Sequence, residues 1–151
     1  MELNEIFSRA NALENLKKPE IRSFSSSNSL DGIGSERIES LKNAVREIRN
    51  LIEERKALSN DFIKEGDEIK LEISNFLLEN KHASDNISEK DFLMEKTSLR
   101  NKKIEISELQ LNEKINCWKD IALLKKELRE HEKELTEKES RLTELNNLLK
   151  E

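Results

Sequence analysis

Residues 121–149 read IALLKKELREHEKELTEKESRLTELNNLL, and this stretch decides the fold. One position in every three or four belongs to a single stripe, and the residues between these positions are mostly Glu, Lys, Arg, Asn or Thr. The stripe consists of Ile121, Leu124, Leu128, His131, Leu135, Lys138, Leu142, Leu145 and Leu149. About four heptads of this pattern predict a coiled-coil helix. Because so narrow a stripe cannot bury itself, the stretch needs a second helix.

The composition favours long helices over a compact domain. Of the 151 residues, 39% are charged and 34% are hydrophobic, aromatic residues make up only 4%, and Tyr is absent. A compact core of this size normally buries several aromatic side chains, whereas abundant Glu, Lys and Leu with helical periodicity is typical of long helices. We therefore predict an all-α chain, an elongated coiled coil of one or two long helices plus a short N-terminal helix.

The same helical spacing begins well before residue 121. With Ser35 placed to cap the helix, apolar residues follow at intervals of three and four. These are Ile38, Leu41, Val45, Ile48 and Ile52. The register continues through Ile115 and Trp118 to Ala122. Near Trp118 the apolar stripe slips by one position, so that its next members are Ile121 and Leu124. Gly66 falls in this register and weakens a helix by about 1 kcal/mol relative to Ala, which makes it a candidate flexible point.

A helix break is predicted between residues 80 and 88. Ser88 and Asp91 stand where a capping box places its two partners, and Ile87 and Phe92 match a hydrophobic staple. These signals favour helices over 36–83 and 88–151 with a turn at 84–87. The unbroken register favours one continuous helix instead.

The first 35 residues divide into two parts. Residues 1–18 form a short amphipathic helix that ends before Pro19; it either folds back on the long helices or orders on a partner. Residues 19–35 contain six serines, two glycines and a proline, and form a flexible linker. This linker is either a plain connector or a phosphorylated segment that acts on the flanking helices.

Charges beside the stripe bear on the choice of partner. The later flanks are mainly acidic, since they contain Asp120, Glu127, Glu132, Glu134 and Glu139. The earlier flanks are basic, with Lys42, Arg49, Lys56 and Lys70. A parallel homodimer would place Glu127 against Glu132, and Glu134 against Glu139. We therefore expect antiparallel pairing, within one chain or between chains, or pairing with a different coiled-coil protein.

No motif predicts catalysis, cofactor binding or a metal site. His82 and His131 lack a metal-ligand pattern, and Cys117, the only cysteine, has no base assigned to it. Positive charge is not concentrated enough for direct nucleic-acid binding. The longest apolar run, residues 121–124, is too short to cross a membrane. We expect a soluble intracellular protein that is not an enzyme.

The predicted functional surface is the apolar seam itself. Its members are Ile38, Leu41, Val45, Ile48, Ile52, Ile115, Trp118, Ile121, Leu124, Leu128, Leu135, Leu142, Leu145 and Leu149. We expect these side chains to bind other coiled-coil proteins in a hetero-oligomer, or a second copy in an antiparallel arrangement.

A short N-terminal helix, a serine linker and a long Lys/Glu/Asn-rich coil together resemble the small coiled-coil subunits of fungal chromosome-bound assemblies. Subunits of fission-yeast meiotic linear elements are similar in size and texture, as are subunits of kinetochore and spindle-pole complexes. The resemblance covers the whole chain and lies in its architecture. It implies a nuclear scaffold on chromosomes, supporting meiotic recombination or acting at kinetochores. The competing expectation is a cytoplasmic tether or adaptor.

Overall fold

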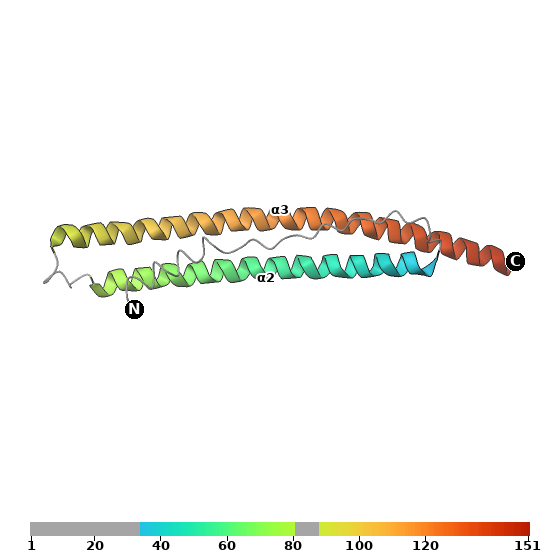
Figure 1. Ribbon diagram of the computed structural model, residues 1–151, viewed down its shortest axis with the longest axis horizontal. Helices are drawn as coiled ribbons and strands as arrows, with labels where there is room; N and C mark the ends of the chain where they lie inside the picture. The colour runs from blue at the N-terminus through green and yellow to red at the C-terminus, as the bar shows by residue number, and fades with distance from the viewer. Residues whose placement is uncertain (1–33, 81–87) are drawn as a thin grey trace. The chain divides into compact units, whose positions relative to one another are not determined.

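The computed structural model describes residues 34–80 and 88–151, and in these ranges the chain is all-helical (Figure 1). Helix α2 covers Ser35–Glu79 and helix α3 covers Glu89–Lys150, and no strand occurs in either described range. The all-α prediction is therefore confirmed. The predicted helix over 1–18, the linker except for its last two residues, and the turn at 84–87 lie outside the described residues.

Helix α3 begins with the side-chain cap that its sequence provides. The backbone N–H of Asp91 donates to Ser88 Oγ, with an N···O distance of 3.3 Å. The N–H groups of Asp91 and Phe92 also donate to the Ser88 carbonyl, at 3.0 and 3.1 Å. The bonds of Asp91 satisfy an N–H group that has no i→i−4 partner at the start of a helix, and the bond of Phe92 is the first i→i−4 bond of α3.

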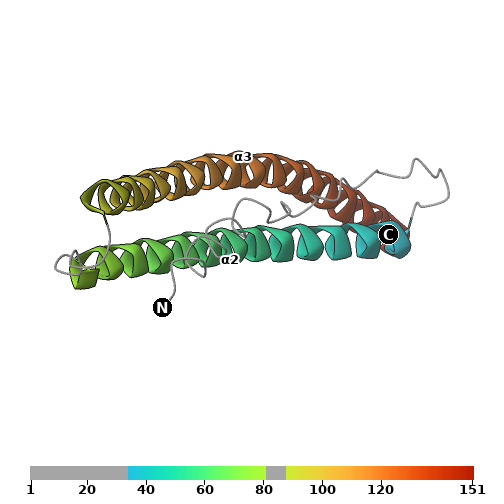
Figure 2. The same cartoon turned by 60° about the vertical axis from the view of Figure 1, so that its left-hand side comes forward.

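The two helices contribute to two compact units. The described part of unit 1 comprises residues 57–80 and 88–117, and that of unit 2 comprises residues 34–56 and 118–151. Within each unit, α2 and α3 lie side by side (Figure 1, Figure 2). They run in opposite directions, because in unit 2 Arg37 contacts Glu134 while Arg55 contacts Asp120.

The core of unit 2 is built from the predicted stripes of both helices. Ile48, Ile52 and Leu124 are at most 5% exposed and form one cluster. The half-buried residues that pack against it are Leu51, Ile121 and Leu128. Burying a side chain of this size stabilises the fold by about 1.5–3 kcal/mol, so this cluster supplies much of the attraction between α2 and α3 here.

Unit 1 has a separate apolar cluster. Its buried members are Ile69 and Ile73 of α2 with Leu99 and Ile106 of α3. The half-buried residues Phe62, Phe76 and Leu77 pack against it. All four buried side chains are no more than 1% exposed.

The apolar register that runs through the sequence to Ala122 predicts the wrong side of α3 for the contact with α2 in unit 1. That register contains Ile104, Leu111 and Ile115, which are 42–59% exposed, whereas Leu99 and Ile106 are buried. Ile104, Leu111 and Ile115 are two, five and nine positions from Ile106, which at 100° per residue places them on roughly the opposite side of the helix. We call Ile104, Leu111 and Ile115 the outer face of α3.

Neighbouring leucines offer a direct test of the core of unit 2. Leu124 is 2% exposed, whereas Leu123 is 59% exposed. Leu124→Ala should lower the free energy of unfolding by about 2–5 kcal/mol because it leaves a cavity in the core. Leu123→Ala, the matched control, should change it by less than about 0.5 kcal/mol. Urea unfolding followed by circular dichroism measures both, and equal losses would show that Leu124 is not a core residue.

Candidate partner-binding surface

The structure divides the predicted seam residues into three groups. The first is buried and consists of Ile38, Leu41, Val45, Ile48, Ile52 and Leu124. The second is half-buried and consists of Ile121, Leu128 and Leu135. The third is exposed and consists of Ile115, Trp118, Leu142, Leu145 and Leu149. Ile48, Ile52 and Leu124 of the first group pack together, with Ile121 and Leu128 of the second group against them. The third group is the exposed part of the predicted seam.

Ion pairs flank the seam in unit 2 and follow its antiparallel direction. Arg37 Nη2 lies 2.8 Å from Glu134 Oε1, and Arg49 Nη2 lies 2.7 Å from Glu132 Oε1. Lys42 Nζ lies 3.2 Å from Glu139 Oε1. Three of the four glutamates that would repel each other in a parallel homodimer, Glu132, Glu134 and Glu139, therefore face basic residues of α2. Each such surface pair contributes at most about 1 kcal/mol, so the charges select the arrangement more than they stabilise it.

Not every basic flank of α2 reaches α3 in this way. Lys56 lies 2.7 Å from Glu53, and Lys70 lies 3.2 Å from Asp67, both within α2. Arg55, a seam position, is 4% exposed and its Nε lies 2.9 Å from Asp120 Oδ2. A buried charge is tolerated only when it is paired, so Asp120 is needed wherever Arg55 is enclosed.

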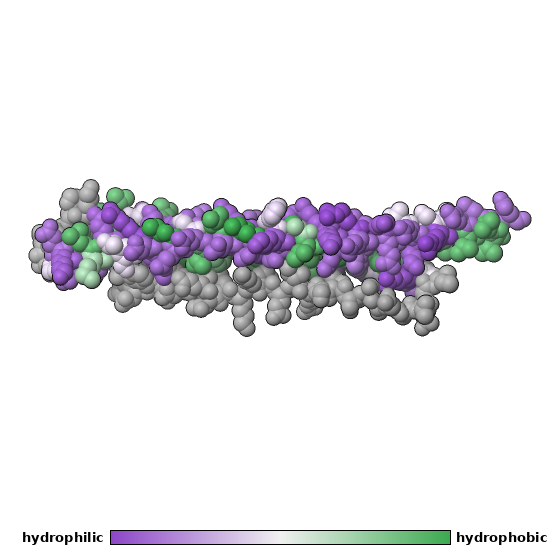
Figure 3. Space-filling view, turned by 90° about the horizontal axis from the view of Figure 1, so that it is seen from above, coloured by the Kyte–Doolittle hydropathy of each residue, from purple (hydrophilic) through white to green (hydrophobic). Residues whose placement is uncertain are grey.

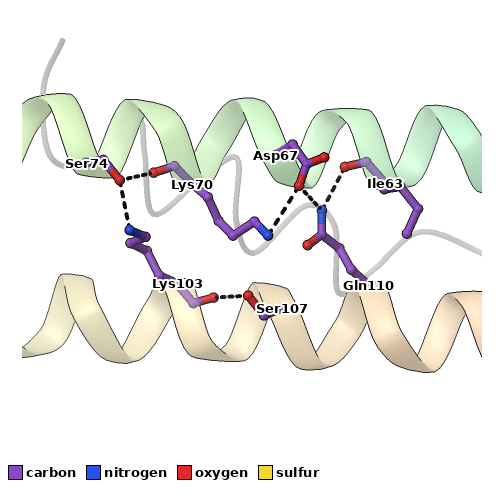
Figure 4. A network of polar contacts seen from close by, with 7 residues as sticks. All are labelled: Ile63, Asp67, Lys70, Ser74, Lys103, Ser107 and Gln110. Carbon is purple, nitrogen blue, oxygen red and sulfur yellow. Dashed lines mark hydrogen bonds and ion pairs between the residues drawn. The ribbon is translucent and has the colours of Figure 1, made fainter.

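Unit 1 contains a polar contact across the helices that the sequence pattern did not indicate (Figure 4). Gln110 is 6% exposed, and its Nε2 donates to the Ile63 carbonyl at 2.7 Å and to Asp67 Oδ1 at 3.0 Å. A Cβ added to Gly66 would collide with the Gln110 amide group. Gly66 is therefore a point of close approach for the Gln110 side chain.

A second polar contact joins the same helices. Lys103 Nζ donates to Ser74 Oγ at 2.8 Å, and Ser74 Oγ donates to the Lys70 carbonyl at 2.8 Å (Figure 4). Sequence reasoning missed these residues because an isolated Gln, Ser or Lys in a polar helix carries no periodic signal. These residues form their contacts only when α2 and α3 pack together.

The described residues contain no group of three or more His, Cys, Asp or Glu side chains that could hold a metal ion. Cys117 is buried, and the half-buried His131 places Nδ1 3.1 Å from the Glu127 carbonyl of its own helix. Neither described helix has an apolar stretch long enough to cross a membrane.

The remaining feature is the apolar surface of α3. In the described residues fourteen large hydrophobic side chains are exposed, three on α2 and eleven on α3. Ten consecutive residues of α3, 141–150, are all exposed. Figure 3 shows hydrophobic side chains near the C-terminal end of the chain. We call Leu142, Leu145 and Leu149 the C-terminal stripe.

Comparison of the chain with protein-family models, with curated proteins and with solved structures finds no match.

The Gly66–Gln110 contact predicts that Gly66→Ala changes the stability of this protein in the opposite direction to the same substitution in an isolated helix. In an isolated helix, Gly→Ala stabilises by about 1 kcal/mol. Here Gly66→Ala should lower the melting temperature, because the new methyl group displaces the Gln110 amide from its two acceptors. In a Gln110→Ala background the same substitution should raise the melting temperature. If Gly66→Ala stabilises the protein in both backgrounds, Gln110 does not occupy this site.

The Asp67 carboxyl predicts an acid-dependent loss of stability. The hydrogen bond from Gln110, together with Lys70, lowers the pKa of Asp67 below its ordinary value of 3.8. A lowered pKa in the folded state means that the ionised carboxyl stabilises the fold above pH 3.8, and that this contribution disappears as the pH falls through the lowered pKa. At pH 7 the melting temperature of the wild type should therefore be higher than that of Asp67→Asn, and this difference should shrink below pH 3.8.

Gln110→Ala provides the control for this measurement. Without the Gln110 donor, Asp67→Asn should have a smaller effect on the melting temperature at pH 7. An effect of Asp67→Asn that is the same at pH 7 and pH 3, or the same with and without Gln110, would contradict the assignment.

Proposed function

We propose that this protein is a structural coiled-coil subunit that joins other proteins through α3. The observation that carries the proposal is the unequal distribution of exposed apolar side chains, eleven on α3 against three on α2. Single exposed hydrophobic residues are ordinary on protein surfaces, but residues repeated at helical spacing match the contacts of a further helix. Both the outer face of α3 and the C-terminal stripe have this spacing.

A scaffold role fits the remaining properties of the chain better than catalysis does. Seam side chains and paired charges hold α2 against α3, and the exposed side chains of α3 include two apolar series at helical spacing. Catalytic sites are usually built in enclosed pockets where pKa values are strongly perturbed. The pKa of the Asp67 carboxyl is lowered mainly by its hydrogen bond from Gln110, so this carboxyl belongs to the contact between the helices.

Affinity purification of the full chain from its native cells tests this proposal. A variant with Leu111→Asp and Leu145→Asp should recover its partner proteins at least tenfold less well, because a contact there would bury unpaired carboxylates. Both leucines are about half exposed, so helix content by circular dichroism should not change. The control is Asn112→Asp with Ser140→Asp, which adds the same charge at exposed polar positions. Equal recovery by both variants would mean that the apolar residues of α3 face water.

The cellular setting that we propose is a multiprotein nuclear assembly on chromosomes, such as the meiotic axis or linear element, or a kinetochore or spindle-pole scaffold. Its support is the architectural resemblance, to which the helical pairing of α2 and α3 adds. A cytoplasmic tether or adaptor is the competing proposal. A fluorescently tagged copy should mark chromosomes in meiotic cells, spindle poles or kinetochores in mitotic cells, or vesicles in the cytoplasm. Vesicle labelling alone would contradict the nuclear setting.

A further inference from the structure

The C-terminal stripe continues the surface by which α3 binds α2. In unit 2, the seam residues of α3 from Ile121 to Leu135 are buried or half-buried, whereas Leu142, Leu145 and Leu149 are 37%, 48% and 84% exposed. The change occurs because α2 begins at Ser35. Among the ion pairs described above, Lys42 with Glu139 reaches furthest along α3, and Glu139 lies two residues before Arg141. A helix that followed the line of α2 beyond Ser35 would cover the stripe and run antiparallel to α3.

The observed ion pairs define which residues of such a helix would face the flanks of α3. Using heptad labels a–g with Leu142 and Leu149 at position a, Arg37 and Glu134 are both g residues, and Lys42 and Glu139 are both e residues. The g residue of the incoming helix therefore faces a g residue of α3, and e faces e. One heptad after Glu134 and Glu139 stand Arg141 and Asn146.

The charge requirement is thus reversed at the C-terminal stripe. Along the part of α3 that α2 covers, Glu132, Glu134 and Glu139 face basic residues. At the stripe the corresponding g residue is Arg141, which favours a carboxylate on the incoming helix. The next g residue, Leu148, is 67% exposed and favours an apolar contact. A helix with the basic flanks of α2 would not satisfy this site.

A second copy of the stripe does not meet the requirement either. When two such segments pair antiparallel with leucine against leucine, the g residues pair in one of two registers. Arg141 then faces either Arg141 or Leu148 of the second copy, so it gains a repulsive contact or none. A parallel second copy would run into α2 before residue 141, since α2 occupies that side of α3.

Resting on the proposed function, we propose that the C-terminal stripe binds a helix of a different protein that runs antiparallel to α3. This helix carries apolar a and d residues against Leu142, Leu145 and Leu149, and a glutamate or aspartate against Arg141. The site thus accepts an acidic-flanked amphipathic helix and rejects a basic-flanked one.

Two synthetic peptides test this charge selection on the full-length chain. Both are fluorescently labelled amphipathic helices of three heptads with Leu at positions a and d, and they differ only at the g residue that would face Arg141, which is Glu in one and Lys in the other. Fluorescence anisotropy at low salt should show that the Glu peptide binds three- to tenfold more tightly, the range expected for exchanging one attractive surface pair for a repulsive one. Arg141→Glu should invert this preference.

Arg129→Glu is the matched control, because it makes the same change of charge at an exposed position of α3 that lies off the seam. It should leave the ratio of the two affinities unchanged. Leu145→Asp should abolish binding of both peptides, and circular dichroism should show that each variant keeps its helix content.

Equal binding of both peptides to the wild type, or a ratio that Arg141→Glu does not change, overturns the proposal. So does sedimentation of the wild type as a dimer that Leu145→Asp converts to a monomer, which would assign the stripe to a second copy. Binding that appears only after deletion of residues 1–33 would assign the stripe to the chain's own N-terminal segment. Charge selection can fail while Leu145→Asp still abolishes binding, and that result leaves the proposed scaffold function intact.

Discussion

The structure depends on one constraint, which is that a helix with a narrow apolar stripe must share it with another helix. In unit 2, Leu124 is 2% exposed and forms one buried cluster with Ile48 and Ile52 of α2. The helices differ in length, 45 residues for α2 and 62 for α3, so an antiparallel pairing cannot cover all of the longer one. Leu142, Leu145 and Leu149 are the residues of the stripe that this pairing leaves exposed.

Charged residues beside the stripe favour one direction of helix pairing over the other. Apolar contacts alone would allow α3 to pair with a parallel copy of itself, since leucine accepts leucine in either direction. The acidic flanks of α3 disfavour that pairing, and Arg37, Lys42 and Arg49 of α2 face three of these glutamates instead. Because each surface pair is weak, selection requires several of them in the same sense, which is the pattern along this part of the chain.

Periodicity in the sequence was enough to predict the all-α fold and to identify the residues that form the core of unit 2. It failed on the first half of α3 because that helix carries two apolar series. Leu99 and Ile106 form one, and Ile104, Leu111 and Ile115 form the other. Spacing cannot tell which series meets α2, since that depends on the partner surface. The contact of Gln110 with Gly66 was unpredictable for a related reason, as the two residues become neighbours only when the helices pack.

Burial of the C-terminal stripe alone cannot give a tight complex. Complete burial of Leu142, Leu145, Leu148 and Leu149 would contribute about 1.5–3 kcal/mol each, and these residues are already partly covered. Association of two proteins costs about 4–15 kcal/mol in lost translational and rotational freedom, which is comparable with the whole gain. A stable assembly therefore requires a second contact on the same partner or on a neighbouring subunit, and the outer face of α3 offers one. Two weak contacts on one helix give high avidity only when the partner engages both together, as it would in a multiprotein scaffold.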